Sequence, residues 1–425
     1  MAVDRNDDVI VAGTSESSDG GFDYATIKYS SAGALLWTNR YNGSANDSDL
    51  ASALAVDANN DVVVTGSSSG GGNNYPGYAT VKYSSTGVPL WTNRYDGSAN
   101  SQDKANAVAV DGSNNVVVTG TSTIIDNSFD WVTIQYSSAG VSLWTNRYNG
   151  LGRSVRGAYA IAVDRSNNVI VAGSSLDQDG RTNCLTIKYS SAGVPIWTKG
   201  YVGPAAGGDG ACAVVVDSSN NVTIAGISAT KTVYPFDYEY VTIQYSSAGV
   251  PVWTNRYNGR GIGDNRSRAL ALDGSNNVIV TGYSSVGYSG GYEYATIEYS
   301  SAGVPLWTNR FAPAGWNSRA NAVAVDRKGS VFVTGKSGGG GAYYFATIKY
   351  LSSPPVLTAL PLTNGNFQMR VDDMMYLRRL VIEASTNAEV WVPLATNAVL
   401  TNHLFFTDQA ATNYLQRFYR TFYLP

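Results

Sequence analysis

The sequence is poor in residues that support several common kinds of protein chemistry. Only one histidine and two cysteines occur in 425 residues, and 14% of the residues are charged. Two cysteines cannot form a disulfide framework, and a single histidine far from any cysteine excludes the usual zinc sites. Because that histidine, His403, lies near the C-terminus, Ser–His–Asp and Cys–His catalysis are excluded from the first 350 residues.

Long apolar runs and an excess of positive charge are also lacking. No apolar run approaches the ~18–20 residues that a membrane-spanning helix requires, so we expect no membrane insertion. The formal net charge is −3, which argues against a nucleic-acid partner. The glycine runs at 70–72 and 338–341 are followed by neither a helix nor a lysine, so they are not phosphate-binding loops.

What the sequence contains is one repeated unit. Its second copy reads ASALAVD (51–57), DVVVTG (61–66), YATVKYS (78–84) and VPLWTNRY (88–95). Seven copies of the VVVTG and ATIKY elements occur, and six of the Trp element. Tryptophans and aspartates recur at intervals of 53 to 56 residues: Trp37, Trp91, Trp144, Trp197, Trp253 and Trp307, and Asp4, Asp57, Asp111, Asp164, Asp217, Asp273 and Asp326.

Each unit carries four β-forming runs that turn residues separate. Four strands in about 54 residues, repeated seven times, predict an all-β fold: a seven-bladed β-propeller with four-stranded blades, followed by a small β-sandwich. We expect the propeller at 1–350, a linker at 351–364 and the small C-terminal β-sandwich at 365–425.

The two ends of the propeller depart from the repeat. The chain begins at MAVD, inside an inner strand, so we expect an N-terminally truncated chain with a shortened first strand. The seventh unit has no WTNRY element, so its outer strand is missing or is replaced by 355–362. Strand-like runs follow the proline-rich linker, at 366–371, 377–386, 389–396, 403–409 and 417–425.

The pattern AVD-x-x-N-N-V-x-V-T-G, followed by YATIKYSSAGVPLWTNRY, resembles the bacterial seven-bladed β-propeller repeat family often labelled SBBP. The resemblance covers residues 1–350. It implies the propeller fold and a secreted or cell-surface setting, and it brings no known catalytic residues. Near the C-terminus, IEASTN, WVPLATN, FTD and QRFYR resemble a fibronectin-like β-sandwich found on secreted bacterial proteins.

The repeated residues are interpreted as structural. The seven aspartates are expected to cap turns by accepting backbone N–H groups, and the six tryptophans to pack between neighbouring blades. The recurring arginines should lie on the opposite face of the strand from Trp, in ion pairs or stacked positions: Arg40, Arg94, Arg147, Arg256 and Arg310. Cys184 and Cys212 are expected to be free, mostly buried thiols.

Three Asp-rich segments faintly resemble calcium loops: DRNDD (4–8), DANND (57–61) and DQDGR (177–181). They lack the spacing and the distal Glu of an EF-hand. We therefore expect no cofactor and no metal, with structural calcium as the weaker alternative.

The copies differ mainly in two loops, those after VVVTG and after WTNRY. Alternate connections of an up-and-down blade emerge on the same face, so both variable loops should lie on one side of the disc. Aromatic and arginine residues, which are favoured at recognition surfaces, gather in these loops in the later units. The predicted ligand-binding residues are Tyr234, Phe236, Tyr238, Tyr288, Tyr292, Trp316, Arg266 and Arg319.

These features favour a monomeric, non-catalytic binding or scaffold module, secreted or at the cell surface, with a glycan or protein ligand on the variable-loop face. The alternatives are a glycan hydrolase or lyase that uses propeller carboxylates, and a passive segment of a larger surface protein. A glycosidase needs two carboxylates about 5–9.5 Å apart. Glu239, Glu293 and Glu298 lie at or near ATIKY-type strands, which suggests structural roles, and we recognise no odd, inward-facing polar residue that breaks the repeat.

Overall fold

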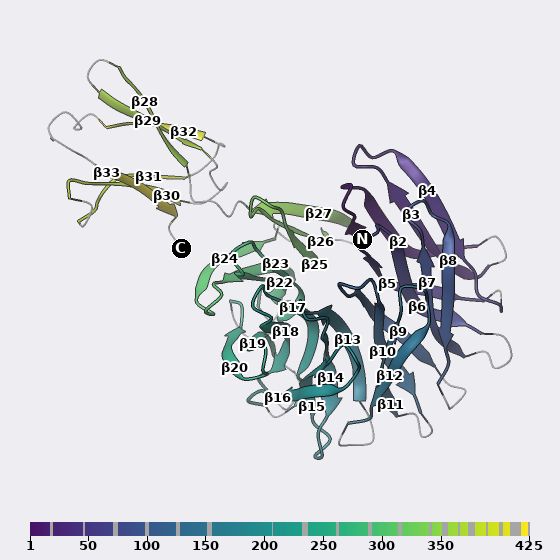
Figure 1. The fold of residues 1–425 in the computed structure, drawn as a ribbon. Coiled ribbons are helices and arrows are strands. Elements are labelled where there is room, and N and C mark those ends of the chain that lie inside the picture. Colours follow the sequence, from purple (N-terminus) through teal and green to yellow (C-terminus); the bar gives the residue numbers. More distant parts are fainter. Residues whose placement is uncertain are drawn as a thin grey trace.

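The computed structural model consists of β-strands arranged as seven blades, followed by two small sheets (Figure 1). Among the residues that it describes, there is no helix long and apolar enough to cross a membrane. It describes residues 1–425 except 18–19, 46, 71–74, 98–101, 125–127, 151–154, 206, 232–236, 261–262, 288–290, 313–316, 340–341, 351–355, 364–365, 373–378, 388–389, 399–402, 409–417 and 424–425.

Blades 1 to 6 each contain four antiparallel strands in chain order. Blade 1 comprises β1 (Ala2–Val3), β2 (Val9–Glu16), β3 (Phe22–Tyr29) and β4 (Leu35–Tyr41). Blade 2 comprises β5 (Asp49–Val56), β6 (Val62–Ser69), β7 (Pro76–Tyr83) and β8 (Pro89–Tyr95), and blade 3 comprises β9 (Asp103–Val110), β10 (Val116–Thr123), β11 (Phe129–Tyr136) and β12 (Ser142–Tyr148).

The later blades repeat this order. Blade 4 comprises β13 (Val155–Val163), β14 (Val169–Leu176), β15 (Thr182–Tyr189) and β16 (Pro195–Tyr201). Blade 5 comprises β17 (Gly210–Val216), β18 (Val222–Ala229), β19 (Tyr238–Tyr245) and β20 (Pro251–Tyr257), and blade 6 comprises β21 (Arg266–Leu272), β22 (Val278–Ser285), β23 (Tyr292–Tyr299) and β24 (Pro305–Phe311). Blade 7 has three described strands, β25 (Asn317–Val325), β26 (Val331–Gly339) and β27 (Ala342–Tyr350). The seven-bladed all-β fold is thus confirmed.

The region after blade 7 differs from the expected linker. Val356–Thr363 forms β28, which pairs with β29 (Asn366–Asp372) and therefore neither replaces the outer strand of blade 7 nor serves as a linker. The physical reason is the Asn-Gly pair at 364–365, which favours a two-residue hairpin loop. The remaining strands are β30 (Arg379–Ser385), β31 (Val392–Ala398), β32 (His403–Asp408) and β33 (Phe418–Tyr423), and they complete two three-stranded sheets, β28–β29–β32 and β31–β30–β33.

Neighbouring blades pack through the repeated aromatic residues, as the sequence predicted. The Trp37 ring of blade 1 lies 6.0 Å from the Tyr83 ring of blade 2, and its Nε1–H donates a 3.1 Å hydrogen bond to the Ser85 carbonyl. The same contact recurs between later blades, where the Trp91 and Tyr136 rings lie 5.9 Å apart in a tilted arrangement. Burying such large rings supplies much of the apolar free energy that holds the blades together.

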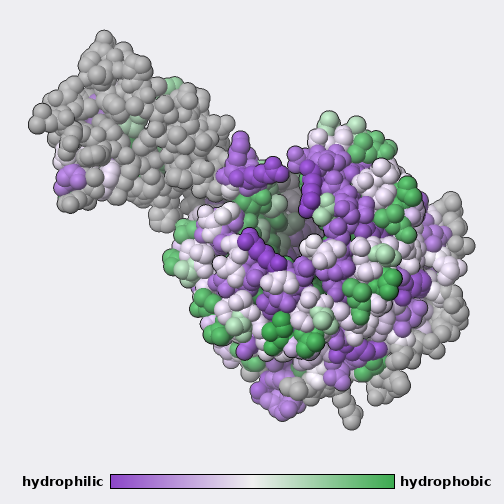
Figure 2. Space-filling model, viewed as in Figure 1, coloured by the Kyte–Doolittle hydropathy of each residue, from purple (hydrophilic) through white to green (hydrophobic). Residues whose placement is uncertain are grey.

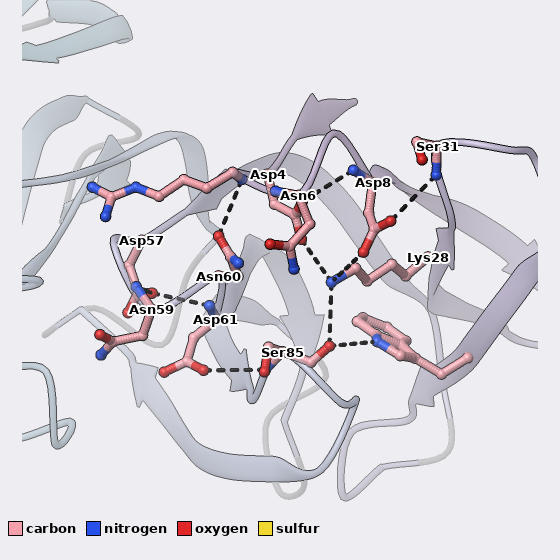
Figure 3. A network of polar contacts seen from close by, with 12 residues as sticks. Asp4, Asn6, Asp8, Lys28, Ser31, Asp57, Asn59, Asn60, Asp61 and Ser85 are labelled. Carbon is pink, nitrogen blue, oxygen red and sulfur yellow. Dashed lines mark hydrogen bonds and ion pairs between the residues drawn. The ribbon is translucent and has the colours of Figure 1, made fainter.

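The repeated aspartates cap turns, as expected, and three of them also bind a buried lysine. Asp4 Oδ1 accepts the N–H groups of Asn6 and Asp8, while Lys28 Nζ lies 2.7 Å from Asp4 Oδ2 and 3.3 Å from Asp8 Oδ2 (Figure 3). Lys28 Nζ also donates to the Ser85 carbonyl of the next blade. The ammonium group therefore lies against two of the carboxylates of the Asp-rich loop that faintly resembled a calcium site.

The β-bulge pocket as candidate functional site

The first strand of blades 2 to 7 contains a β-bulge at one fixed repeat position. In blade 2, Ala51 pairs with Gly66 and Ala53 pairs with Thr65, so Ser52 between them has no partner in the ladder. The bulged residue differs in chemistry around the ring: Ser52, Asn106, Tyr159, Cys212, Arg268 and Asn321. From the sequence we recognise no odd, inward-facing polar residue and do not single out this position, which varies in each of blades 2 to 7.

The constant glycine of the VVVTG element makes the bulge possible. A Cβ atom on Gly66 would lie 2.0 Å from the Leu50 carbonyl oxygen, and one on Gly282 would lie 2.0 Å from that of Arg266. Only a residue without a side chain allows the bulged strand to approach so closely. A β-bulge changes the direction in which a side chain points. In this repeat the bulged backbone is constant, whereas the side chain at the bulge varies between blades.

The bulged residues of blades 4, 5 and 6 meet in one pocket. Tyr159, Cys212 and Arg268 line this bulge pocket, which has a volume of about 620 Å³. The other lining residues are Ser174, Thr182, Gly208, Asp209, Gly210, Ala211, Ile227, Tyr238, Arg266 and Ser267. Several of them stand at strand ends next to the variable loops, so the pocket opens on the variable-loop face. Its size suits a small ligand or part of a polymer.

Two arginines give the pocket positive groups. The Arg266 guanidinium lies 4.6 Å from the centroid of the Tyr238 ring, and its Nε donates a 2.6 Å hydrogen bond to Asp264 Oδ1. The exposed Arg268 guanidinium lies 5.5 Å from the Tyr283 ring centroid. Tyr159 is 43% exposed and adds an aromatic ring to the lining of the pocket. Guanidinium groups beside aromatic rings favour an anionic ligand that also has an apolar face.

The acid and the thiol that line the pocket have structural partners. Asp209 is 1% exposed and accepts hydrogen bonds from the N–H groups of Gly203 and Ala229, at 2.7 and 3.2 Å, which orders the preceding loop. Burial raises the pKa of the Cys212 thiol, which donates to the Ser267 carbonyl at 3.2 Å. A protonated thiol is a poor nucleophile.

The propeller glutamates are likewise held in cross-strand contacts. Glu239 is ion-paired with Arg256, and Glu293 lies 3.2 Å from Arg310, in the position where Asp23 pairs with Arg40 in blade 1. Burial raises the pKa of Glu293, and the two neighbouring arginines oppose that shift. The same pair occurs in blades 1, 3, 5 and 6, which matches the structural role predicted for the recurring arginines.

Glu298 departs from the repeat in a different way. It is 5% exposed and occupies the position of Lys28 and Lys82 in their blades. Burial, followed by the charge of Asp273, raises the pKa of Glu298, which accepts a 3.1 Å hydrogen bond from Asn277 Nδ2. Blade 6 therefore holds two neighbouring carboxyl groups where blades 1 and 2 hold an ion pair.

The predicted ligand-binding residues are divided by the structure. Tyr238 and Arg266 line the bulge pocket. Arg319 and Tyr292 form an adjoining cluster with Tyr283, because the Arg319 guanidinium lies 4.3 and 4.7 Å from the two ring centroids. The other four lie outside the described residues: Tyr234, Phe236, Tyr288 and Trp316.

Sequence reasoning missed the three bulged residues Tyr159, Cys212 and Arg268. The available signal was their variation at one position between small residues of otherwise constant strands. A second pocket, of about 440 Å³, lies at the opposite turns and is lined by residues that recur in the repeat, such as Asp57 and Asp111. That pocket also has one varying position, occupied by Arg5, Ala58, Gly112 and Arg327, whereas the bulge pocket gathers the varying bulged residues of three blades.

No family model and no curated protein matches the chain. Solved structures that resemble it include Drosophila plexin A in complex with semaphorin 1b, with 9% identity, a TM-score of 0.44 and coverage of 80% of this chain and 86% of that one. An ulvan lyase has 9% identity, a TM-score of 0.46 and coverage of 78% and 88%. An α-L-arabinofuranosidase of Fusarium graminearum with arabinobiose has 8% identity, a TM-score of 0.43 and coverage of 70% and 92%. At these values the likenesses carry no argument about function.

Proposed function

We propose that this chain is a non-catalytic binding module that recognises an acidic glycan in the bulge pocket on its variable-loop face. The observation that carries the proposal is the convergence of three unlike bulged residues, Tyr159, Cys212 and Arg268, on one pocket of an otherwise regular ring. Residues that serve only the fold repeat between blades, whereas these do not.

The ligand class follows from the lining. Arg268 suits a carboxylate or sulfate group, whereas Arg266 is already ion-paired with Asp264. Tyr159 and Tyr238 offer ring faces on which a sugar ring can stack. The carboxylates that a glycosidase would use are engaged elsewhere: Asp209 holds backbone N–H groups, and Glu239 and Glu293 hold arginines. This supports binding over hydrolysis or elimination. The resemblance to the SBBP family supports a secreted or cell-surface setting for such a module.

A glycan array that contains neutral, uronic-acid and sulfated oligosaccharides tests the ligand class, and calorimetry then measures the affinity for the best binder. We expect acidic glycans to bind and Arg268→Ala to weaken binding by about 10-fold or more, because a hydrogen bond to a charged group contributes roughly 1.5–3 kcal/mol. Tyr159→Ala should also weaken binding.

Asn321→Ala is the matched control, because Asn321 occupies the equivalent bulge in blade 7 and is not among the pocket-lining residues. Equal losses from Arg268→Ala and Asn321→Ala would contradict the assignment of the site. Release of shorter products from a bound glycan would contradict the non-catalytic part of the proposal. If the array shows no binding at all, the module has another ligand class or serves as a passive spacer.

A further inference from the structure

One buried tyrosine joins the bulge pocket to the cluster that adjoins it. The Tyr283 ring is 3% exposed, and the guanidinium carbon of Arg268, which lines the pocket, lies 5.5 Å from its centroid. The guanidinium carbon of Arg319 in blade 7 lies 4.7 Å from the same centroid and 4.3 Å from that of Tyr292. Two positive groups from different blades therefore lie beside one ring, although Arg319 is not among the residues that line the pocket.

The charges around this ring do not balance. Asp264 accepts hydrogen bonds from Arg266 Nε at 2.6 Å and from the Tyr283 hydroxyl at 3.3 Å. Burial and the Asp264 charge raise the pKa of Tyr283, whereas the three neighbouring arginines oppose that shift. Within the part of the chain that the structure describes, neither Arg268 nor Arg319 forms an ion pair with a carboxylate. Three arginines thus surround the ring, and one aspartate, already bound to Arg266, opposes their charge.

The fold does not require an arginine at position 319. Arg319 lies two residues before the bulged residue of its strand, and this position is not constant among the other blades, where it is Leu50, Lys104, Gly157, Gly210 and Arg266. In the β25–β26 ladder, the exposed Lys336 stands opposite Arg319. Like charges directly opposite each other destabilise a sheet. Arg319 therefore costs the fold stability, which points to a role in recognition.

Open space lies at the centre of the ring, near the strands that carry these arginines. Figure 1 shows the first strands of the blades, such as β13, β17 and β25, around that centre, and Figure 2 shows a hollow there with hydrophilic residues around its mouth. Arg268 is exposed and Arg319 is half-buried, so solvent reaches both side chains. The two tyrosine rings hold the Arg319 guanidinium by cation–π contacts, and a group that is held in place before binding loses less freedom when a ligand arrives.

We propose that the ligand of the bulge pocket carries two neighbouring anionic groups, the first bound by Arg268 and the second by Arg319. This inference rests on the proposed function, because it specifies the charge pattern of the acidic glycan. A guanidinium group binds a carboxylate or a sulfate through paired N–H donors, so each arginine accommodates one such group. The ligand class is therefore a glycan with charges on adjacent sugar units, either consecutive uronic acids or a uronic acid next to a sulfated sugar.

Two pairs of probes distinguish one anionic group from two. The first pair is galacturonic acid and its α-1,4-linked dimer, and the second is the unsulfated and the monosulfated disaccharide of chondroitin. Calorimetry with the full chain should show that the doubly charged member of at least one pair binds about tenfold or more tightly than the singly charged member. Arg319→Ala should remove that advantage and leave the affinity for the singly charged member unchanged, whereas Arg268→Ala should lower both affinities.

Lys104→Ala is the matched control, because the exposed Lys104 occupies the position of Arg319 in blade 3 and its removal takes away the same charge. It should leave every affinity unchanged. Arg319→Gln keeps part of the side-chain stem and should bind the probes as Arg319→Ala does. Circular dichroism should show the native fold for all of these variants.

Equal affinities for the two members of both pairs would overturn the inference and leave the proposed function intact, provided that Arg268→Ala lowers them. Equal losses from Lys104→Ala and Arg319→Ala would also overturn the inference, because net charge would then explain the effect. Binding to no member of either pair would overturn the acidic-glycan function and this inference together.

Discussion

The constant glycines are predicted to be essential to the bulges, and Gly282→Ala is the most informative change. The added Cβ atom would lie 2.0 Å from the Arg266 carbonyl oxygen, 2.8 Å from Ser267 Cα and 2.9 Å from the Arg266 carbonyl carbon. All three are backbone atoms of the bulged strand, so no side-chain rotation relieves the clash. Overpacking of this kind costs about 1–3 kcal/mol.

Gly13→Ala is the matched control, because it is the same repeat position in blade 1 and its Cβ atom would meet nothing within 4 Å. There the loss of unfolded-state freedom stabilises by about 0.4–1 kcal/mol. The two variants should therefore differ by about 1.4–4 kcal/mol in the free energy of unfolding. With an unfolding entropy of roughly 2.1 cal/mol/K per residue over about 350 residues, this corresponds to roughly 2–5 °C in Tm.

Thermal unfolding followed by circular dichroism measures this difference. Gly282→Ala should also weaken ligand binding, because the strand that presents Arg268 must move to accommodate the methyl group. Equal Tm values for the two variants would refute the role assigned to the glycine.

Two further predictions concern buried charge. Lys82→Met should lower the free energy of unfolding by about 3–5 kcal/mol in urea titrations, because the buried Asp57 carboxylate loses the ammonium 2.8 Å away. Lys82→Gln should cost less, because the equivalent residue of blade 3, Gln135, donates a 3.0 Å hydrogen bond to Asp111. Equal costs for the two variants would contradict this account. Because burial raises the pKa of Glu298 in the folded chain, the folded state binds the proton more tightly than the unfolded state, and stability should fall as pH rises from the unfolded value of 4.5 through the folded pKa. Glu298→Gln removes this pH dependence, so the Tm of the variant minus the Tm of the unchanged chain should increase from pH 4 to pH 7. A difference that stays constant with pH would contradict the raised pKa of Glu298.

The fold was accessible from the sequence because the repeat copies its own signals. Trp37 and its equivalents, the aspartate caps and the left-handed Asn60, with φ of 65°, each follow from residue type and spacing. A strand at 355–362 was considered only as the outer strand of blade 7, and its pairing with β29 was not predicted although Asn-Gly at 364–365 is a hairpin signal.

The candidate site was only partly accessible. Aromatic and arginine residues near the variable loops predicted a site on that face, and two of them, Tyr238 and Arg266, line the pocket. The bulged residues were missed because strict alternation assigns each strand residue to a face, whereas a bulge places two residues opposite one. The bulged residues also meet in one pocket only because adjacent blades are arranged around a common axis. The sequence of a single repeat does not specify that arrangement.

The most direct test of the central claim is a crystal structure of the chain with the acidic oligosaccharide that binds most tightly on the array. The proposal predicts an anionic group within hydrogen-bonding distance of Arg268 and a sugar ring against Tyr159. Ligand bound instead at the opposite turns beside Asp57 and Asp111, or on the outer strands, would contradict it.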